Sequence, residues 1–315
     1  MSYSEDDFPV AISQNLINRF HSDPLHALAN AWRMRGADAI WTMLEWEWIG
    51  VALLQRFRIV PRVPVIANSV WLFNHWAHWS EKRRRFYRWL MVENFVFTVH
   101  AKTSLEIAKT VIPERIFQLS PFGISTRAFP VTPPSRIEVG KRPIRIYSIG
   151  TDRTRDWKTL MAAFGNDARF EVRLVSSWAQ EVIDGPSYSN LVQPTDVSIE
   201  GMRANYEWAD IVIVPMVENV FSGITVALEG AACGKPVISS RTGGVPTYFD
   251  DGEVIFVPPS DPDALRSAAL SDPSLLLFHA IQAQKRFERS GYSAAAMMDR
   301  YIALTNKVLS ERSRS

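Results

Sequence analysis

The residues best suited to chemistry lie between Ser222 and Gly234, in the run SGITVALEGAACG. A Ser-Gly turn before an apolar helical stretch exposes backbone N–H groups at the positive end of a helix, and such an end binds phosphate. Glu229 lies one and a half to two turns into the predicted helix, where its carboxylate could accept both hydroxyls of a ribose. From the residues alone, a surface glutamate on an amphipathic helix is an equally good interpretation.

Two further segments combine glycine or positive charge with the ends of predicted strands. Gly243 and Gly244, within the run RTGGVP, would let a backbone approach a ligand closely. The segment Gly150–Lys158 follows a strand and would place cations against a diphosphate. Its cations are Arg153, Arg155 and Lys158. Taken singly, these segments also fit an ordinary tight turn and a solvated charged loop.

Short apolar runs alternate with longer amphipathic runs along the whole chain. In the first half this pattern predicts strands at 37–44, 63–70, 94–101 and 116–121 and helices at 46–57, 82–92 and 103–111. In the second half it predicts strands at 144–149, 170–175, 210–215, 236–239 and 254–257 and helices at 156–164, 202–209, 224–233, 263–269, 273–289 and 294–309. Such alternation indicates two doubly wound α/β domains with parallel sheets. Ligands of these domains bind beyond the carboxyl ends of the strands, so a site in a cleft between the domains is expected.

A proline-rich stretch without periodicity, 126–142, separates the two halves and is predicted to be a linker. We therefore expect one domain over 1–135 and a second over 136–292. A helix over 293–315 follows, and its return to the first domain is one option. The first domain is predicted to be abbreviated, because no opening strand and glycine-rich loop precede Ala37.

Composition excludes several classes of protein. The 315 residues are 47% hydrophobic and 22% charged, as in a soluble globular protein. A net charge of +2 is too small to indicate a nucleic-acid partner. The single cysteine, Cys233, can form neither an internal disulfide nor a zinc cluster and is expected in the core. No apolar run reaches the ~20 residues that span a bilayer, so a cytoplasmic protein is expected.

The first half carries eight of the eleven tryptophans, together with a basic run at Lys82–Trp89 (KRRRFYRW). Aromatic and basic residues together are typical of a peripheral contact with the inner face of the cell membrane. A solvated basic helix beside a tryptophan-rich core is the alternative. His75 and His78 lack the further ligands that a metal site needs, and no metal is expected.

Two polar residues follow predicted strands of the first half. His100 would face the cleft as a catalytic residue, or else be a buried histidine with its hydrogen bonds made. Glu45 or Glu47 would bind an acceptor or assist its deprotonation.

The block Ser222–Pro246 resembles the donor-binding signature of the retaining glycosyltransferases of family 4, also called group 1. The order of the surrounding pieces strengthens this resemblance, which extends over roughly residues 90 to 310. These pieces are Gly150–Leu160, Ala209–Pro215, Asp251–Leu265 and Tyr292–Tyr301 in the second half, with Phe97–Ala101 and Pro121–Phe129 before them.

The resemblance implies a GT-B fold of two Rossmann-like domains facing across a cleft, with acceptor side first and nucleotide-sugar side second. It implies transfer of a hexose from a UDP- or GDP-linked sugar, with retention of the anomeric configuration and without a metal or a cofactor. The implied acceptor is a polysaccharide or a lipid-linked saccharide, as in exopolysaccharide biosynthesis. Arg155 and Lys158 would stabilise the leaving diphosphate, and Glu229 would hold the ribose. Further donor contacts would come from Gly150, Thr151, Arg153, Glu218, Ser222, Gly223, Ile224, Thr225, Gly243 and Gly244.

The sequence departs from the family pattern at two positions of this block. Phe221 stands eight residues before Glu229, where the family carries a second glutamate, and Glu218 lies eleven residues before it. Thr247 replaces the glutamate that usually follows the glycine pair. A non-catalytic partner subunit that binds a nucleotide sugar or activates another transferase is therefore the alternative. An epimerase or phosphorylase on the same scaffold is a further one.

Overall fold

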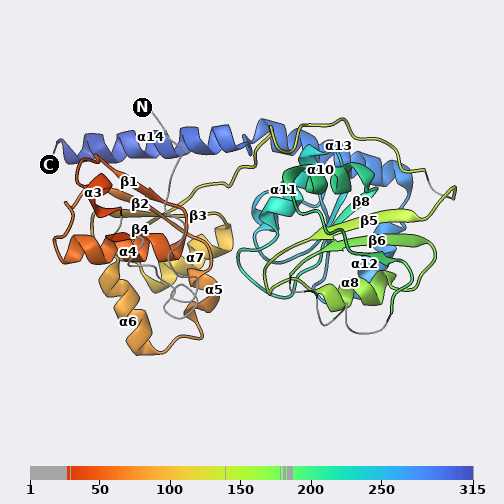
Figure 1. The fold of residues 1–315 in the computed structure, drawn as a ribbon, viewed down its shortest axis with the longest axis horizontal. Coiled ribbons are helices and arrows are strands. Elements are labelled where there is room, and N and C mark those ends of the chain that lie inside the picture. Colours follow the sequence, from red (N-terminus) through yellow and green to blue (C-terminus); the bar gives the residue numbers. More distant parts are fainter. Residues whose placement is uncertain are drawn as a thin grey trace. The chain divides into compact units, whose positions relative to one another are not determined.

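The computed structural model describes residues 27–28, 30–138, 140–177, 179, 182 and 187–314 (Figure 1). The chain divides into two compact units. The N-terminal unit comprises Met1–His100, Ser104–Ser120 and Arg300–Ser315, and the C-terminal unit comprises Ala101–Thr103 and Pro121–Asp299. The last helix, α14 (Ala294–Arg312), therefore begins in the C-terminal unit and ends in the N-terminal unit.

The N-terminal unit contains a parallel sheet in the order β1-β2-β3-β4. Its strands are β1 (Ile40–Thr42), β2 (Val65–Ser69), β3 (Phe95–Val99) and β4 (Ile116–Leu119). Every residue of β2 and β3 is buried, which is the pattern of strands covered on both faces. The helices of this unit are α3 (Ala31–Met34), α4 (Glu45–Arg56), α5 (Leu72–Trp76), α6 (Glu81–Leu90) and α7 (Lys102–Val111).

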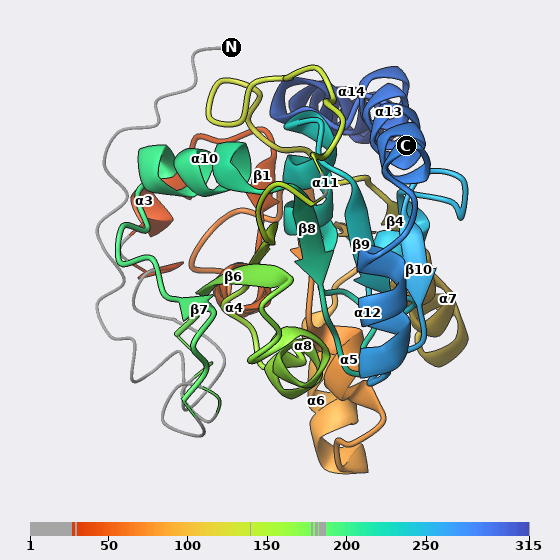
Figure 2. The same cartoon turned by 90° about the vertical axis from the view of Figure 1, so that its right-hand side faces the viewer.

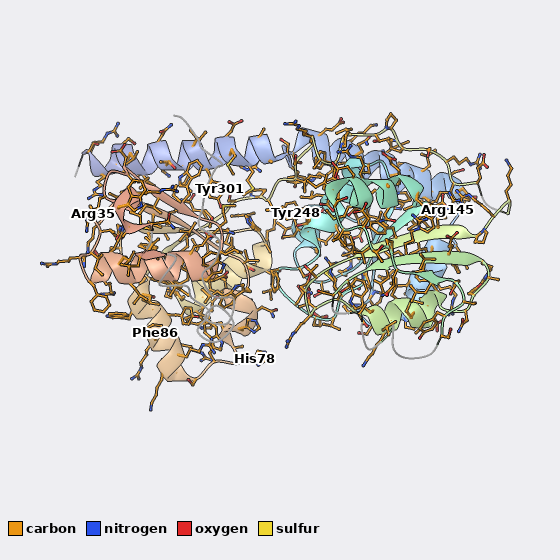
Figure 3. The ribbon with its side chains drawn as sticks, viewed as in Figure 1. Arg35, His78, Phe86, Arg145, Tyr248 and Tyr301 are labelled. Atoms are coloured by element: carbon orange, nitrogen blue, oxygen red, sulfur yellow. The ribbon has the colours of Figure 1, made fainter. Side chains whose placement is uncertain are left out.

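The end of α14 completes the core of the N-terminal unit (Figure 3). Tyr301 is buried, and its hydroxyl lies 3.0 Å from the hydroxyl of Thr98 in β3. Trp41 of β1 donates from its indole nitrogen to the hydroxyl of Thr305 at 2.8 Å. These contacts join residues that are 203 and 264 positions apart in the sequence and place one face of the sheet against α14.

The C-terminal unit contains a parallel sheet in the order β10-β9-β8-β5-β6-β7. Its strands are β5 (Ile144–Ile149), β6 (Phe170–Val175), β7 (Leu191–Val192), β8 (Ile211–Val214), β9 (Val237–Ser240) and β10 (Ile255–Val257). Its helices include α8 (Trp157–Phe164), α10 (Ile199–Trp208), α11 (Ile224–Ala232), α12 (Pro262–Ala269) and α13 (Pro273–Arg289).

Two hydrophobic clusters lie on opposite faces of this second sheet. Along β8, Val212 and Val214 belong to one cluster, whereas Ile211 and Ile213 belong to the other, because successive strand residues point to opposite faces. Figure 2 shows α10, α11 and α13 on one side of the sheet and α8 and α12 on the other. This is the doubly wound arrangement that the alternating pattern predicts.

The predicted strands and helices are present, with ends that shift by a few residues. Three of them, 144–149, 170–175 and 273–289, have the expected bounds. The strand predicted at 37–44 is wrong in length, because the structure pairs only Ile40–Thr42 with β2. The helix predicted at 202–209 begins earlier, since the Ser198 hydroxyl accepts from the Gly201 N–H and caps it. The short elements α3, α5 and β7 were not predicted. Cys233 is buried, as expected.

Candidate functional site

The three segments that carry chemistry follow adjacent strands of the C-terminal sheet. Gly150 follows β5, Met216–Gly223 follows β8 after Pro215, and Gly243 comes shortly after β9. From β5 the chain continues to β6 on one side, whereas β8 and β9 lie on the other side. The order of strands therefore reverses at β5, and such a switch point is where open α/β sheets bind ligands. The structure therefore brings these three segments together at one edge of the sheet.

Asp152 links the loop after β5 to the loop after β8. One carboxylate oxygen accepts a hydrogen bond from the Ser222 hydroxyl at 2.9 Å and lies 3.3 Å from Arg155 Nε. The other accepts from the Thr154 N–H at 3.0 Å. Burial opposes ionisation of Asp152, but Arg155 and the hydrogen bonds from Thr154 and Ser222 outweigh it and hold its pKa below the usual value. The site thus contains a fixed, ionised carboxylate that orients Arg155.

Arg155 is a buried cation with unused hydrogen-bonding capacity. Its side chain is only 5% exposed, and its Nη1 is buried without a hydrogen-bond partner in the part of the chain that the structure describes. Burial also lowers the pKa of its guanidinium. Gly150 makes room for it, because a Cβ there would lie 2.3 Å from Arg155 Nε. A buried N–H group without a partner costs free energy, so this guanidinium is suited to an anionic ligand.

The glycines after β9 pack against the loop after β8. The Gly243 N–H donates to the Asn219 carbonyl at 3.1 Å, and the Gly244 N–H donates to the Ser222 carbonyl at 2.9 Å. Gly243 has φ +69°, and a Cβ there would lie 2.5 Å from the Ser222 carbonyl oxygen. The close approach that these glycines allow is therefore to the neighbouring loop.

Asn219 and Thr242 fix the shape of that neighbouring loop. The Asn219 side-chain oxygen accepts from the Phe221 and Ser222 N–H groups at 3.1 and 2.8 Å. The Thr242 hydroxyl accepts from the Asn219 N–H at 3.1 Å and lies 3.1 Å from the exposed Glu218 carboxylate. Both residues were missed in the sequence, because a polar residue in a loop gives no pattern that separates it from a solvated one.

Helix α11 begins at this site with Gly223 at its N-cap and no side chain capping it. Gly223 has φ +90°, and a Cβ there would lie 2.7 Å from the sulfur of Met216. Because the first N–H groups of a helix have no partner within it, those at Ile224 and the exposed Thr225 are suited to a phosphate oxygen.

Glu229 lies on the inner side of α11 and is only 8% exposed. The Tyr206 hydroxyl donates to its carboxylate at 2.6 Å. Burial raises the pKa of Glu229 to about 7, although Tyr206 and the nearby Arg155 both favour the charged form. The ring of Tyr147 packs against that of Tyr206, and its buried hydroxyl has no hydrogen-bond partner within the described ranges. The interpretation of Glu229 as a surface residue is therefore wrong.

A pocket of about 470 Å³ opens beside the loop after β5. Arg155 lines it together with the exposed Arg153 and Lys158, so three of the predicted donor contacts come together there. The remaining lining residues are Asp152, Asp156, Trp157, Val182 and Val217. Thr151 is exposed in the same loop. Among the described residues no group of His, Cys, Asp or Glu is arranged to hold a metal ion.

Glu45 of the N-terminal unit lies in the interior. One of its carboxylate oxygens accepts from the N–H groups of Val70, Trp71 and Leu72 at 2.7, 2.8 and 2.8 Å. Burial raises its pKa to about 7 against these hydrogen bonds. Glu45 therefore holds the turn between β2 and α5. The neighbouring Glu47 accepts from the Met43 and Leu44 N–H groups at the start of α4.

His100 is buried at the carboxyl end of β3. Its Nδ1 lies 2.7 Å from the Ser120 carbonyl, and its Nε2 lies 3.0 Å from the Asn68 amide nitrogen. An Nδ1–H donor and an Nε2 acceptor satisfy both contacts, which is the neutral tautomer. Burial lowers the pKa of His100, in keeping with a neutral ring. Of the two interpretations offered by the sequence, the buried histidine with its hydrogen bonds made fits this geometry.

Solved structures share the architecture over nearly the whole chain. Sucrose-phosphate synthase from Thermosynechococcus elongatus matches with a TM-score of 0.74 at 19% identity, covering 95% of this chain and 80% of that chain. Anabaena Alr3699/HepE in complex with UDP and glucose matches with a TM-score of 0.72 at 14% identity, covering 93% and 83%. These likenesses establish the class of fold, GT-B, as the sequence predicts.

Within that class, residues 153–271 match the family described as glycosyl transferases group 1. D-inositol 3-phosphate glycosyltransferase from Corynebacterium jeikeium is 44% identical over 72 residues, which are 21% of this chain and 17% of that protein. A second protein of that name, from Catenulispora acidiphila, is 30% identical over 138 residues, 36% of this chain and 32% of that protein. The aligned part therefore spans a third or less of these relatives. The resemblance seen in the sequence is confirmed.

Proposed function

We propose that this chain transfers a hexose from a nucleoside diphosphate sugar to a saccharide acceptor. The observation that carries the proposal is the buried guanidinium of Arg155, whose Nη1 has no partner among the described residues, at the switch point of the C-terminal sheet. A buried cation beside an uncapped helix end suits a diphosphate, because both features supply hydrogen-bond donors to anionic oxygens. The match of residues 153–271 to the family of glycosyl transferases group 1 supports the same conclusion.

In the proposed mechanism, positive charge on the protein stabilises the diphosphate as the bond to the sugar breaks. Arg155, held by Asp152, would donate to one phosphate, and Lys158 at the mouth of the pocket would approach the other. The N–H groups of Ile224 and Thr225 would take the remaining oxygens. Fixed donors of this kind gain strength as charge develops on the leaving group. They supply the charge that a metal ion would otherwise provide, which supports metal-independent transfer without a cofactor.

The remaining donor contacts would come from Glu229 and from Glu218. Glu229 would accept ribose hydroxyls with the carboxylate oxygen that Tyr206 leaves free. The exposed carboxylate of Glu218 would contact the sugar in place of the glutamate that Phe221 replaces. We further propose a UDP- or GDP-linked donor and retention of the anomeric configuration, by the resemblance to family 4.

We propose a polysaccharide or lipid-linked saccharide as the acceptor, with the Lys82–Trp89 region in contact with the membrane. The exposed Phe86 and Trp89 of α6 support such a contact, because aromatic rings favour the headgroup layer. None of the described helices has the length and apolar character of a membrane span.

The test is release of nucleoside diphosphate from a panel of UDP- and GDP-sugars, with membrane lipid extract as the source of acceptor. Glu229→Ala is expected to lower the release from one donor by about 100-fold, equivalent to about 2.7 kcal/mol of transition-state stabilisation. Glu207→Ala is the matched control, since Glu207 is an exposed glutamate on the neighbouring α10. Equal loss in both variants, or no release from any donor by the folded wild type, would contradict the proposal.

The second candidate is a partner subunit that binds a nucleotide sugar without turning it over. Phe221 favours it, because a phenyl ring cannot make the sugar-hydroxyl contact of the missing glutamate. Tight binding of a UDP- or GDP-sugar by calorimetry, without release of nucleoside diphosphate, would support this candidate over the first.

A further inference from the structure

An open hollow of about 630 Å³ in the N-terminal unit is lined, among the described residues, by three arginines and no acidic residue. The arginines are Arg35, Arg58 and Arg62, and the other lining residues are Ile59, Val60 and Pro61. A guanidinium is planar, and its N–H donors are spaced to bond two oxygens of a phosphate. Three arginines around one hollow therefore favour a phosphorylated ligand.

The hollow lies at the edge of the sheet opposite the carboxyl ends of its strands. Arg35 precedes β1, and the segment 58–62 directly precedes β2. Asn68, His100 and Ser120 instead lie at or just after the carboxyl ends of β2, β3 and β4. Because open α/β units bind substrates at carboxyl ends, the hollow is separate from any acceptor site of this unit.

Among the described residues, the arginines of the hollow have no anionic partner. The side chains of Arg35, Arg58 and Arg62 form no ion pair or hydrogen bond with another described residue. On α6, by contrast, Glu81 lies within 3.9, 3.6 and 3.3 Å of Arg84, Arg85 and Arg88. The hollow therefore holds three cations whose charge no described carboxylate offsets.

Charge crowding extends to Arg56, at the end of α4. Burial, together with the positive charges of Arg62 and Arg115, lowers the pKa of its guanidinium. An anion bound beside Arg62 would relieve this repulsion.

The backbone at Arg58 is strained for a side chain other than glycine. Arg58 has φ +58° and ends α4, where the Ile59 N–H donates to the Leu54 carbonyl at 2.9 Å. Glycine is the usual residue at this position of a helix end, because a Cβ is unfavourable at positive φ. An arginine at such a position indicates that its side chain has a use.

Large hydrophobic side chains surround these cations and are exposed. Phe57 is 68% exposed and Ile59 is 40% exposed, and on α6 the values for Phe86 and Trp89 are 47% and 43%. The Arg56 guanidinium stacks over the Trp89 ring at 4.3 Å, which places the end of α6 beside the end of α4. Figure 3 shows Arg35 and Phe86 at the periphery of this unit. Exposed aromatic rings around a phosphate site are of use only to a ligand that also offers an apolar layer.

We propose that this hollow binds the phosphate of an anionic lipid headgroup at a membrane surface. Arg35, Arg58 and Arg62 surround the phosphate, while Phe57 and Ile59 enter the interfacial layer. This inference rests on the membrane contact in the proposed function, to which it adds a specific lipid-binding pocket. Vesicle binding is measured without donor or acceptor, so failure of either proposal can be told from failure of the other.

The experiment is co-sedimentation of the full chain with vesicles of equal parts phosphatidylglycerol and phosphatidylcholine. Arg58→Gly and Arg62→Gln are each expected to weaken partitioning about fivefold, the typical contribution of one basic residue at an anionic surface. Arg169→Gln is the matched control, because it removes one positive charge from the C-terminal unit, at an arginine that is paired with Asp167. Its partitioning should change by less than half as much. Phe57→Ser is expected to weaken vesicle binding as well.

Loss of vesicle binding by Arg58→Gly cannot be attributed to misfolding if its melting temperature stays the same or rises. This is the expected result, because glycine is favourable at φ +58°. Equal losses for Arg169→Gln and Arg58→Gly would overturn the pocket in favour of diffuse attraction. Equal binding to vesicles of phosphatidylcholine alone would overturn the requirement for an anionic headgroup. Saturating pyrophosphate should weaken vesicle binding, because it competes with the lipid phosphate for the hollow. Vesicle binding that persists while pyrophosphate fills the hollow would overturn the pocket. Binding of pyrophosphate by a chain that does not bind the anionic vesicles would overturn the lipid in favour of a free phosphate.

Discussion

Two buried glutamates, one in each unit, have a pKa raised to about 7 but different surroundings. Glu45 accepts three backbone N–H groups with one oxygen, and no cation contributes to its pKa. Glu229 accepts one side-chain hydroxyl and lies within the electrostatic influence of Arg155. Similar pKa values therefore arise at a structural clamp and at a candidate binding site, and the partners of a buried carboxylate distinguish the two better than its pKa does.

The largest expected difference between Glu45 and Glu229 is in how much their substitution changes the free energy of unfolding. Glu45→Leu should lower the free energy of unfolding by roughly 4 kcal/mol, because it leaves three buried N–H groups without an acceptor, at about 1–3 kcal/mol each. Urea denaturation measures it. Glu45→Gln, which keeps one acceptor oxygen, is the control and should lose much less. A loss below about 1 kcal/mol in Glu45→Leu would contradict the clamp.

The next effect is a pH dependence that both residues share. A carboxyl whose pKa rises from 4.5 to about 7 on folding holds its proton more tightly in the folded state. Its contribution is fully present below about pH 4.5 and is lost as pH rises towards 7 and above, up to about 3 kcal/mol per group. Urea denaturation at pH 5 and pH 8 should show the wild type to be more stable at pH 5. Glu45→Gln should reduce this difference; an unchanged difference would mean that Glu45 does not titrate in this range.

Activity should separate the residues in the opposite direction to stability. Glu229→Gln is expected to lower the turnover of the nucleotide sugar about 100-fold, or about 2.7 kcal/mol, with less than 1 kcal/mol lost from the stability. Release of nucleoside diphosphate and urea denaturation, measured on one preparation, test both parts. If stability falls as much as transition-state stabilisation, Glu229 is a structural clamp like Glu45.

The smallest effect concerns the hydroxyl that Glu229 accepts. Tyr206→Phe removes one hydrogen bond to the charged carboxylate and should cost about 1.5 kcal/mol of stability at pH 8 and less at pH 5. It should also raise the pKa of Glu229 further, since the hydrogen bond favours the charged form. The pH profile of turnover would show this as a shift of its acidic limb to higher pH; a shift to lower pH would contradict the assignment. The pKa of Glu45 should not change.

The fold followed largely from periodicity. Strands such as β5 and β6 had the expected bounds because they are continuous apolar runs bordered by turns. The short β7 and α5 have too few residues to show a period, and they are fixed by their neighbours. For the candidate site, charge and glycine next to strand ends predicted Arg155, Lys158 and Glu229. Asp152, Asn219 and Tyr206 were not predicted, because their roles depend on contacts with residues far away in sequence.

The helix α14 bears on the order in which this protein can fold during synthesis. Its residues Tyr301 and Thr305 complete the core of the N-terminal unit, yet the ribosome makes them only after the whole C-terminal unit. Nascent chains usually fold domain by domain from the N-terminus. Here one face of the β1–β4 sheet stays uncovered until residues 300–312 have left the ribosome, so the N-terminal unit cannot complete its core before then. The C-terminal unit, which is contiguous apart from Ala101–Thr103, has no such delay and is expected to fold first.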